Sequence, residues 1–451
     1  MIFIKKVIIF FICLFIPTLC QEIPPYLIDS KIKKIRFDLG KDWINNSTLN
    51  SLRFDNLEFS KLAYASHFSF KRDLNYNLNC YNRINLPNYM YAYANIKLKS
   101  NSINIFDNYK DNFSLESDHS GIGYRNGWLS LQLGKGTQNW GANHGIELSL
   151  YEKSESYNYG LLGLDFDKIR VKYLHGYLEK DSIDFNRFLT ARGIELTDNK
   201  SIIFGISEIV IYSGLNRHFD FSYLNPMSTH LEIELNDRTN LIGTGSGNGI
   251  WQLSFDYFSK YNIRLSFNYL IDEFVLDKEQ ILEGKSDGSG YSFKIAYSNP
   301  INDKDEFILF FSRISIGTHT FRHQLGSNNF VVGGKPIGSS LGSDCYQNKL
   351  GLILSLNKKL FLTSNIEGYI SGEKNIIDNP YDPYTNYLIE NFPSGNKSSY
   401  LSFKNEVEFY LNQRYSFSIF MKLKRNNYSF NNEITEAVGF SIASSYLLLG
   451  R

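Results

Sequence analysis

Aromatic side chains stand beside amides in several segments that read as loops. Trp140 is followed by Asn143, and Tyr223 is followed by Asn225. An aromatic ring can stack under the apolar face of a pyranose, while amide groups beside it hydrogen-bond the sugar hydroxyls. These segments fit the physical signature of a saccharide contact, but the residue types alone do not identify a sugar as the ligand. Because the chain holds 31 Tyr, packing or an interfacial position competes with ligand contact as the explanation for any single ring.

Patterns that would indicate catalysis or metal binding are weak. His319 and His323 are four residues apart, which on a strand is about 13 Å, too far for one metal ion. The eight His residues include no HExxH sequence, and no spacing of Ser, His and Asp marks an activated nucleophile. We therefore expect no metal, no cofactor and no enzymatic activity. A hydrolase site assembled from distant strands stays open as a less favoured alternative.

The composition excludes some partners and contains one anomaly. The chain has 451 residues, a formal net charge of +1 and 21% charged residues, so it has no global field that would recruit nucleic acid. Its aromatic content is high, with 35 Phe, 31 Tyr and 4 Trp. So many rings need a location besides one core. The interfacial girdles of a membrane barrel provide such a location.

The first twenty residues have the features of a secretory signal peptide. Lys5 and Lys6 precede an apolar stretch over 7–16, and the pattern predicts cleavage after Cys20. Only Cys80 and Cys345 then remain well inside the chain, and we expect both to be unpaired.

Beyond residue 21 no apolar run is long enough for a transmembrane helix, whereas period-two alternation recurs. It is clear at 146–151, 251–257, 263–269 and 438–448, where apolar and polar residues take turns. The pattern predicts an all-β protein, a transmembrane antiparallel β-barrel. At roughly 23 residues per strand and turn, the chain allows about eighteen strands, with a range of 16–18.

Charged residues of both signs alternate with apolar residues in these segments. A mixed lining favours ion-pair networks in an occluded lumen over an open, ion-selective pore. The residues expected to point inward are Glu147, Arg170, Lys172, Asp256, Arg264, Glu406, Glu408, Lys422 and Lys424.

We expect three regions along the chain. Residues 1–20 form the signal peptide, and residues 86–451 form the barrel. Residues 21–85 between them form a periplasmic or plug segment with a possible short helix around 57–68.

The stretch from Trp140 to Asn240 resembles the capsule-assembly Wzi family of outer-membrane proteins, including its Bacteroidota-type members. The resemblance extends to later turn segments and spans roughly half of the chain. It is carried by Trp140-Gly141, Arg192, Ser207-Glu208 with Tyr212, Tyr223-Leu224-Asn225-Pro226, Pro336-Ile337-Gly338, Leu341-Gly342-Ser343-Asp344 and Gly372-Glu373.

The resemblance implies an outer-membrane barrel of about eighteen strands in a Gram-negative bacterium. It further implies a lectin that binds capsular or other surface polysaccharide and helps anchor or assemble the capsule without processing it. Outer-membrane lipid, and the barrel-assembly machinery during insertion, are the other expected partners. Arg192 and Glu208 are expected to face inward and to pair. The binding residues implied are Trp140, Asn143, Arg192, Glu208, Tyr212, Tyr223 and Asn225. The alternative function is a porin-like solute channel.

Overall fold

The structure is a computed structural model, and it describes most of the chain beyond residue 58. The described residues are 59–71, 76–100, 113–142, 145–151, 154–198, 201–236, 238, 247–273, 282, 288–302, 305–357, 359–383, 391–411, 415–427 and 432–449. The expected signal peptide and residues 21–58 lie outside them. No helix within these ranges is both long and apolar enough to cross a membrane.

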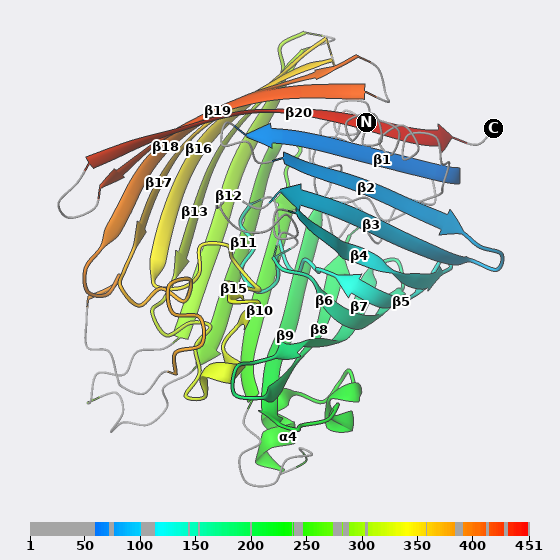
Figure 1. The fold of residues 1–451 in the computed structure, drawn as a ribbon, viewed down its shortest axis with the longest axis vertical. Coiled ribbons are helices and arrows are strands. Elements are labelled where there is room, and N and C mark those ends of the chain that lie inside the picture. Colours follow the sequence, from blue (N-terminus) through cyan, green and yellow to red (C-terminus); the bar gives the residue numbers. More distant parts are fainter. Residues whose placement is uncertain are drawn as a thin grey trace.

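One antiparallel sheet of eighteen strands dominates the structure (Figure 1). Its first nine strands are β1 (Phe59–Lys71), β2 (Tyr76–Asn85), β3 (Met90–Ser100), β4 (Phe113–Arg125), β5 (Leu129–Gly136), β6 (Tyr157–Asp165), β7 (Ile169–Lys180), β8 (Phe185–Thr197) and β9 (Ile202–Leu215). The other nine are β10 (Gly247–Phe258), β11 (Ile263–Glu273), β12 (Gly288–Pro300), β13 (Glu306–Ile316), β16 (Cys345–Leu356), β17 (Leu360–Ser371), β18 (Ser398–Tyr410), β19 (Tyr415–Asn427) and β20 (Asn432–Leu449).

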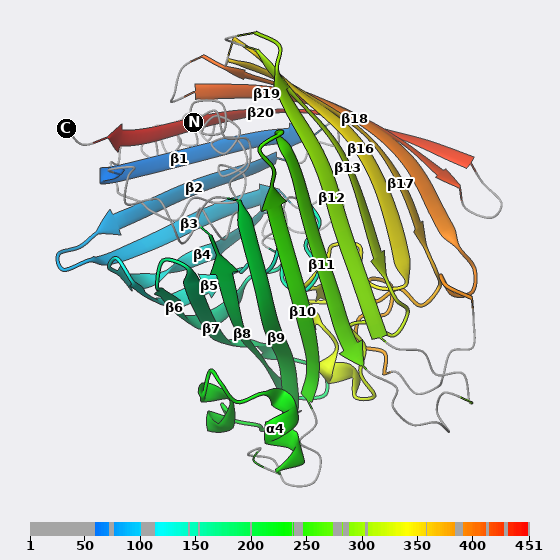
Figure 2. The same cartoon turned by 180° about the vertical axis from the view of Figure 1, so that it is seen from behind.

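The sheet closes on itself. Each strand pairs with the strands before and after it in the sequence, and β20 pairs with β1 from Phe59↔Leu449 to Lys71↔Gly439. Figure 1 shows β20 beside β1, and Figure 2 shows β9 to β13 crossing the opposite wall. Within the described ranges, this closure leaves the barrel sheet with no unpaired edge strand. A bilayer would not tolerate an unpaired edge. The predicted barrel of 16–18 strands is confirmed.

The barrel begins earlier in the chain than expected. Strands β1 and β2 pair with each other, and β2 also pairs with β3, so residues 59–85 belong to the wall. The expected boundary at residue 86 is therefore wrong, as is the helix around 57–68. Pairing on both sides decides the structure here, and it overrides weak local preferences.

Side chains alternate across the wall, as the sequence predicted. Polar residues on β11 point into the lumen, while the apolar residues between them are exposed on the outer face. The inward residues of β11 are Arg264, Ser266 and Asn268, and the outward residues are Leu265, Phe267 and Tyr269. In the lumen Arg264 forms an ion pair with Asp256, and Arg170 one with Glu195. The outer face thus carries an apolar belt suited to lipid, and the lumen holds charges of both signs.

The two ends of the barrel differ. At one end, named the turn end here, short connections such as 126–128, 166–168 and 259–262 join the strands, and β1 begins there while β20 finishes there. At the other end, the loop end, the connections are long, among them 137–156, 216–246, 317–344 and 372–397.

The described residues of three long loops, 137–156, 317–344 and 372–397, fold into the lumen at the loop end, and we call them the plug. Inward-facing amides of the wall serve as hydrogen-bond partners for the loop backbone. Asn268 on β11 donates to the carbonyls of Ala142 (2.6 Å) and Ile146 (3.1 Å) and accepts from the Ala142 N–H (2.8 Å). Gln252 on β10 accepts from the Ser149 N–H (3.1 Å). Buried loop backbone needs such partners, since water does not reach it.

Residues 146–151, expected to form a strand, lie in the first of these loops. Their apolar residues are fully buried, but within the described part of the chain they pair with no sheet strand. The Leu148 carbonyl instead accepts from Ser339 (2.9 Å), and Tyr151 donates to the Ile337 carbonyl (3.1 Å). Alternation indicates only that a segment has one apolar face. In residues 146–151 this face packs against another loop of the plug.

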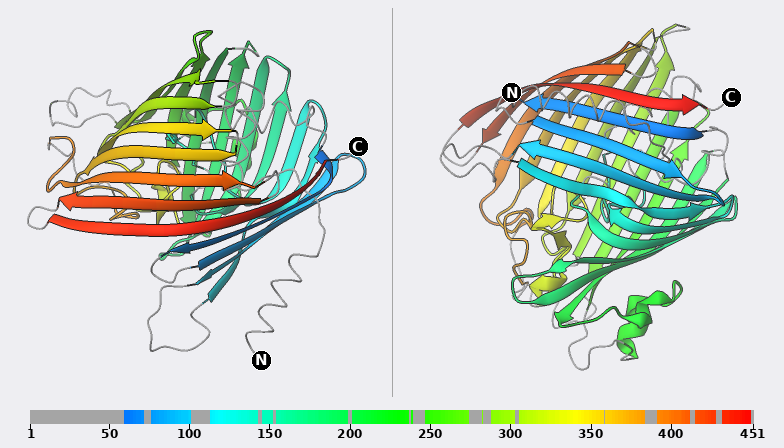
Figure 3. Two further views of the ribbon diagram at one scale, coloured as in Figure 1. Left: turned by 90° about the horizontal axis from the view of Figure 1, so that it is seen from above. Right: turned by 45° about the vertical axis from the view of Figure 1, so that its right-hand side comes forward.

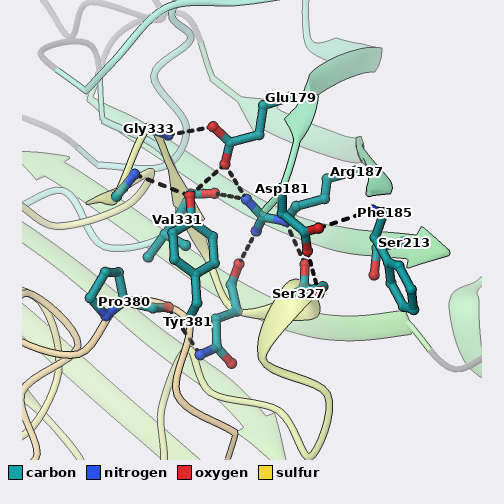
Figure 4. A network of polar contacts seen from close by, with 12 residues as sticks. Glu179, Asp181, Phe185, Arg187, Ser213, Ser327, Val331, Gly333, Pro380 and Tyr381 are labelled. Carbon is teal, nitrogen blue, oxygen red and sulfur yellow. Dashed lines mark hydrogen bonds and ion pairs between the residues drawn. The ribbon is translucent and has the colours of Figure 1, made fainter. Parts of the chain in front are cut away.

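Arg187 on β8 anchors the second loop, which contains η2 (Gly326–Asn328), β14 (Val331–Val332) and β15 (Lys335–Pro336) (Figure 4). Its guanidinium is fully buried and donates to the carbonyls of Ser327 (2.5 Å), Asn329 (2.7 Å) and Val331 (2.9 Å). It also pairs with Glu179 at 2.5 Å. One cation therefore fastens three backbone positions of the loop to the wall.

Asp344 joins the second and third loops. Its carboxylate accepts hydrogen bonds from the Ser394 N–H (2.9 Å) and hydroxyl (2.6 Å), and from the Thr318 hydroxyl (2.8 Å). A Cβ at Gly372 would come within 2.1 Å of this carboxylate, so glycine is required there. Two segments that carry the family resemblance, 341–344 and 372–373, thus meet inside the plug.

Replacing Arg187 with Met is expected to loosen the plug. The change leaves three buried carbonyls and the Glu179 carboxylate without their cation, at a cost of about 3–5 kcal/mol. We expect openings in planar lipid bilayers for Arg187→Met and no steady current for the unmodified protein. Lys180→Met on β7, which removes a half-exposed lysine, is the control and should stay silent. Steady porin-like current from the unmodified barrel would contradict the occluded lumen.

Candidate binding site on the outer wall

The long connection between β9 and β10 lies outside the barrel rather than in the lumen. Its described residues, 216–236 and 238, contain η1 (Phe221–Leu224) and α4 (His230–Leu235), seen as the green helical ribbon beside the wall in Figure 3. Local capping explains both turns. Asp220 accepts from the Ser222 N–H (3.0 Å) before η1, and Thr229 accepts from the Glu232 N–H (3.2 Å) before α4. We call residues 216–238 the outer segment.

Arg192 and Glu208 face this outer segment, not the lumen. On β9, Ile209 and Ile211 pack in the lumen cluster, so Glu208 between Ser207 and Ile209 projects outward, and its register partner Arg192 does the same. The expectation that both point inward is wrong. It assumed that a charge on the outer face would meet lipid, but the outer segment covers this part of the wall.

The two charges pair with each other and hold the outer segment in place. Arg192 Nε lies 3.2 Å from Glu208 Oε2, and both side chains are buried. Glu208 also accepts from the backbone N–H of His230 (3.0 and 3.1 Å). Arg192 Nη1 donates to the Asn225 carbonyl (3.2 Å). The pair therefore connects the wall to both ends of the η1–α4 connection.

Tyr212 and Tyr223 stack face to face beside this pair, with ring centroids 4.8 Å apart. A hydrogen-bond chain runs past them. The Asp220 N–H donates to the Tyr212 hydroxyl (3.2 Å), which donates to His175 Nε2 (2.6 Å). His175 Nδ1 then donates to the Tyr173 hydroxyl (2.9 Å), which donates to the Tyr223 carbonyl (2.8 Å). A neutral His175 ring, donating from Nδ1 and accepting at Nε2, satisfies every donor and acceptor of this chain.

His230 of α4 is also held neutral. Its Nδ1 accepts from the Tyr223 hydroxyl (2.8 Å), and its Nε2 lies 3.3 Å from the Gly247 carbonyl, to which it donates. Burial, together with the nearby Arg192 cation, lowers the pKa of His230 to about 4, against the opposing effect of the Gly247 carbonyl. The Glu234 carboxylate, 3.5 Å from Nε2, has its own pKa raised by burial. The ring packs over Gly249, where a Cβ would come within 2.6 Å of it.

The remaining predicted site residues lie apart from this group or at its edge. Trp140 is buried in the plug, and its carbonyl accepts from Gln252 (3.3 Å). Asn143 lies outside the described residues. Asn225 is exposed, and its side chain bonds Ser228 (2.8 Å) and the Met227 N–H (3.0 Å). The structure thus brings together Arg192, Glu208, Tyr212, Tyr223 and Asn225, and places Trp140 on the other side of the wall.

A groove of about 910 Å³ opens on the outer wall between β4 and β8, next to the outer segment. Polar groups line one side of it, with Ser120, Lys135 and Asn158 in one register row. Aromatic groups line the other side. They are Tyr177, Phe188, His175 and Phe219, and Phe219 stacks on His175 with centroids 3.8 Å apart. We call this the outer-wall groove.

The sequence contained one overlooked signal for the groove. Outward positions on β5 are apolar at Leu131 and Leu133, and the next outward position is Lys135, paired with Asn158 of β6. Lys135 and Asn158 thus interrupt the series of apolar outward residues, and this interruption marks the position of the groove. Gly160 of β6 faces outward between Leu133 of β5 and His175 of β7, and its lack of a side chain keeps the floor of the groove open. No group of three or more His, Cys, Asp or Glu that could hold a metal occurs in the described ranges.

Removing the Glu208 carboxylate is expected to release the outer segment. Glu208→Ala leaves Arg192 buried without a counter-charge, which costs about 3–5 kcal/mol, and removes the acceptor of the His230 N–H. We expect faster tryptic cleavage at Arg217, which is buried in the docked segment. Glu232→Ala on α4 removes only an exposed ion pair with Arg238, worth up to about 1 kcal/mol, and serves as control. Equal cleavage rates in the two variants would show that the buried pair does not hold the segment.

Docking of the outer segment should weaken in acid. Because the pKa of His230 is depressed to about 4, the undocked segment takes up the proton first, starting near pH 6.5. The stability contributed by a neutral His230 is therefore full above that pH and falls as the pH drops toward 4, by about 2 kcal/mol at pH 5. Hydrogen exchange of the α4 amides, corrected for intrinsic rates, should show lower protection at pH 5 than at pH 7.5. His230→Gln should remove the difference, and equal protection of the unmodified segment at both pH values would refute the effect.

Comparison with known proteins returned structures only. No family model and no curated protein matches the chain. It is similar in structure to Wzi of Escherichia coli, described as a carbohydrate-binding β-barrel involved in group 1 capsule assembly (9% identity, TM-score 0.62, 92% of this chain and 89% of that chain). It also matches OprD of Pseudomonas aeruginosa (10%, 0.46, 86% and 94%) and OccAB1 of Acinetobacter baumannii (7%, 0.46, 86% and 95%). At these identities the likeness shows the fold, which is that of outer-membrane β-barrels.

Proposed function

We propose that this chain is an outer-membrane protein of a Gram-negative bacterium that binds capsular or another surface polysaccharide and holds it at the cell surface without cleaving it. The likeness to the Wzi barrel supports the fold of this proposal, and the residues that carry the family resemblance support its capsule-assembly role. The loop end faces outward, because long loops of such barrels are extracellular and short turns periplasmic. Outer-membrane lipid surrounds the apolar belt after insertion by the barrel-assembly machinery.

The outer-wall groove is the observation that carries the proposal. Saccharide sites combine aromatic faces with amide, amine and hydroxyl groups, and the groove offers Tyr177 and Phe219 on one side and Asn158, Lys135 and Ser120 on the other. Its volume of about 910 Å³ lies in the range of ligand sites. The rings are fixed in advance, because Phe219 rests on a histidine whose two nitrogens are both bonded.

The predicted binding residues take a supporting part in this proposal. Arg192, Glu208, Tyr212 and Tyr223 hold the outer segment against the wall, and the segment in turn supplies Phe219 to the groove. A rigid support lowers the entropy that a flexible loop would lose when the polymer binds.

The plug supports a surface role over a solute channel. Arg187 and Asp344 fasten two of the three plug loops, 317–344 and 372–397, through buried charge-assisted hydrogen bonds. A pathway for solutes through the loop end would require those bonds to break. The same fastening keeps the outward surface of the loops fixed for contact with a polymer.

Filling the floor of the groove should abolish polysaccharide binding. Gly160→Leu adds a side chain where the Cβ has only the Leu133 side chain near it, at 3.2 Å, so the barrel should still fold. We expect the affinity of a labelled surface polysaccharide for the barrel in nanodiscs to fall at least about tenfold. Gly368→Leu is the matched control, because Gly368 also faces outward, on β17, with nothing within 4 Å of its Cβ position. Unchanged binding by Gly160→Leu would remove the groove from the proposal, and shortening of the polymer during incubation would favour a hydrolase.

A further inference from the structure

The outer-wall groove lies directly beside the apolar belt. Ile122 on β4 and Leu133 on β5 are opposite each other in the register and are 52% and 64% exposed on the outer face. The next outward pair toward the loop end is Ser120 and Lys135, which line the groove. Two residues along a strand correspond to about 7 Å. The change from apolar to polar wall therefore falls at the edge of the groove itself.

A continuous row of outward residues crosses five strands at this level. It runs from Ser120 through Lys135, Asn158 and Tyr177 to Phe188, each paired with the next in register. The row begins polar and ends aromatic, which is typical of the interface between hydrocarbon and headgroups. A soluble polymer has no need of an apolar wall directly below its site, but a lipid-linked saccharide does.

Lys135 supplies the charge of this row. No ion-pair partner of its amine occurs in the part of the chain that the structure describes. An ammonium group on a flexible stem at the level of the headgroups attracts phosphate or carboxylate groups. The outer segment extends the apolar surface on the far side of the groove, where Phe221 is 76% and Met227 72% exposed.

We propose that the outer-wall groove binds the anionic saccharide headgroup of an outer-leaflet glycolipid, with the acyl chains lying on the belt around Ile122 and Leu133. Lys135 contacts the anionic group, Asn158 and Ser120 bond hydroxyls, and the sugar stacks against Tyr177 and Phe219. This inference rests on the proposed saccharide function of the groove. It adds that the barrel holds a glycan by its lipid-anchored end.

The test uses the full barrel in detergent micelles and two probes, a phosphorylated disaccharide glycolipid and the same molecule after removal of its acyl chains. Native mass spectrometry measures the affinity of each. We expect the acylated probe to bind at least about tenfold more tightly. Leu133→Ser should remove most of that difference without changing the binding of the deacylated probe. Ile122→Ser, on the neighbouring strand, should act in the same way and guards against a folding defect in one variant.

The charge is tested separately. Lys135→Gln should weaken both probes by roughly five- to tenfold and have no effect once the phosphates are removed. The controls are Leu309→Ser, at a lipid-facing position of β13, and Lys260→Gln, at an exposed position in the β10–β11 turn.

Each outcome decides between the two proposals. If both probes bind with equal affinity and Leu133→Ser changes neither affinity, the glycolipid inference is overturned. The groove would then remain a site for soluble glycan. Failure of the acylated probe, the deacylated probe and the polysaccharide to bind would overturn the proposed function as well.

Discussion

The rest of this structure depends on one constraint, that a charged group on the outward face of a membrane barrel has to be kept away from hydrocarbon. Arg192 and Glu208 stand on that face, paired at 3.2 Å. An uncovered charge inside a bilayer costs several kcal/mol. The outer segment provides the cover, with Tyr223 and His230 packed over the pair. The edge of this cover forms one side of the outer-wall groove, so the site follows from the way in which the charges are shielded.

The same demand for polar partners shapes the lumen. The inward side of the wall carries polar and charged residues beside an apolar cluster, and the three loops that enter the lumen must satisfy their own backbone groups there. Asn268 and Gln252 act as substitutes for backbone partners, and Arg187 binds three carbonyls of one loop. The plug is thus held by directional bonds as well as by apolar packing. Because these bonds are directional, removing the Arg187 guanidinium tests directly whether they hold the plug.

Period-two alternation was enough to predict the barrel, the approximate strand number and the mixed charges of the lumen, because alternation is a local property of each strand. It failed where tertiary contacts decide. Residues 146–151 alternate but pack inside the plug, and the outward direction of Glu208 depends on a segment that follows it in the sequence. The groove could not be predicted from alternation, because its prediction requires knowing that Lys135 of β5 and Asn158 of β6 are paired. That pairing is set by the register of the two strands.

The central claim is that the glycan is held on the outside of the wall and not in the lumen. The most direct measurement places a photo-activated cross-linking residue at one position at a time on living cells: Asn158, in the groove, or Asn365, buried on the lumen side of β17. The account predicts that glycan becomes attached to the barrel from position 158 and not from position 365. Attachment from position 365 alone would contradict it.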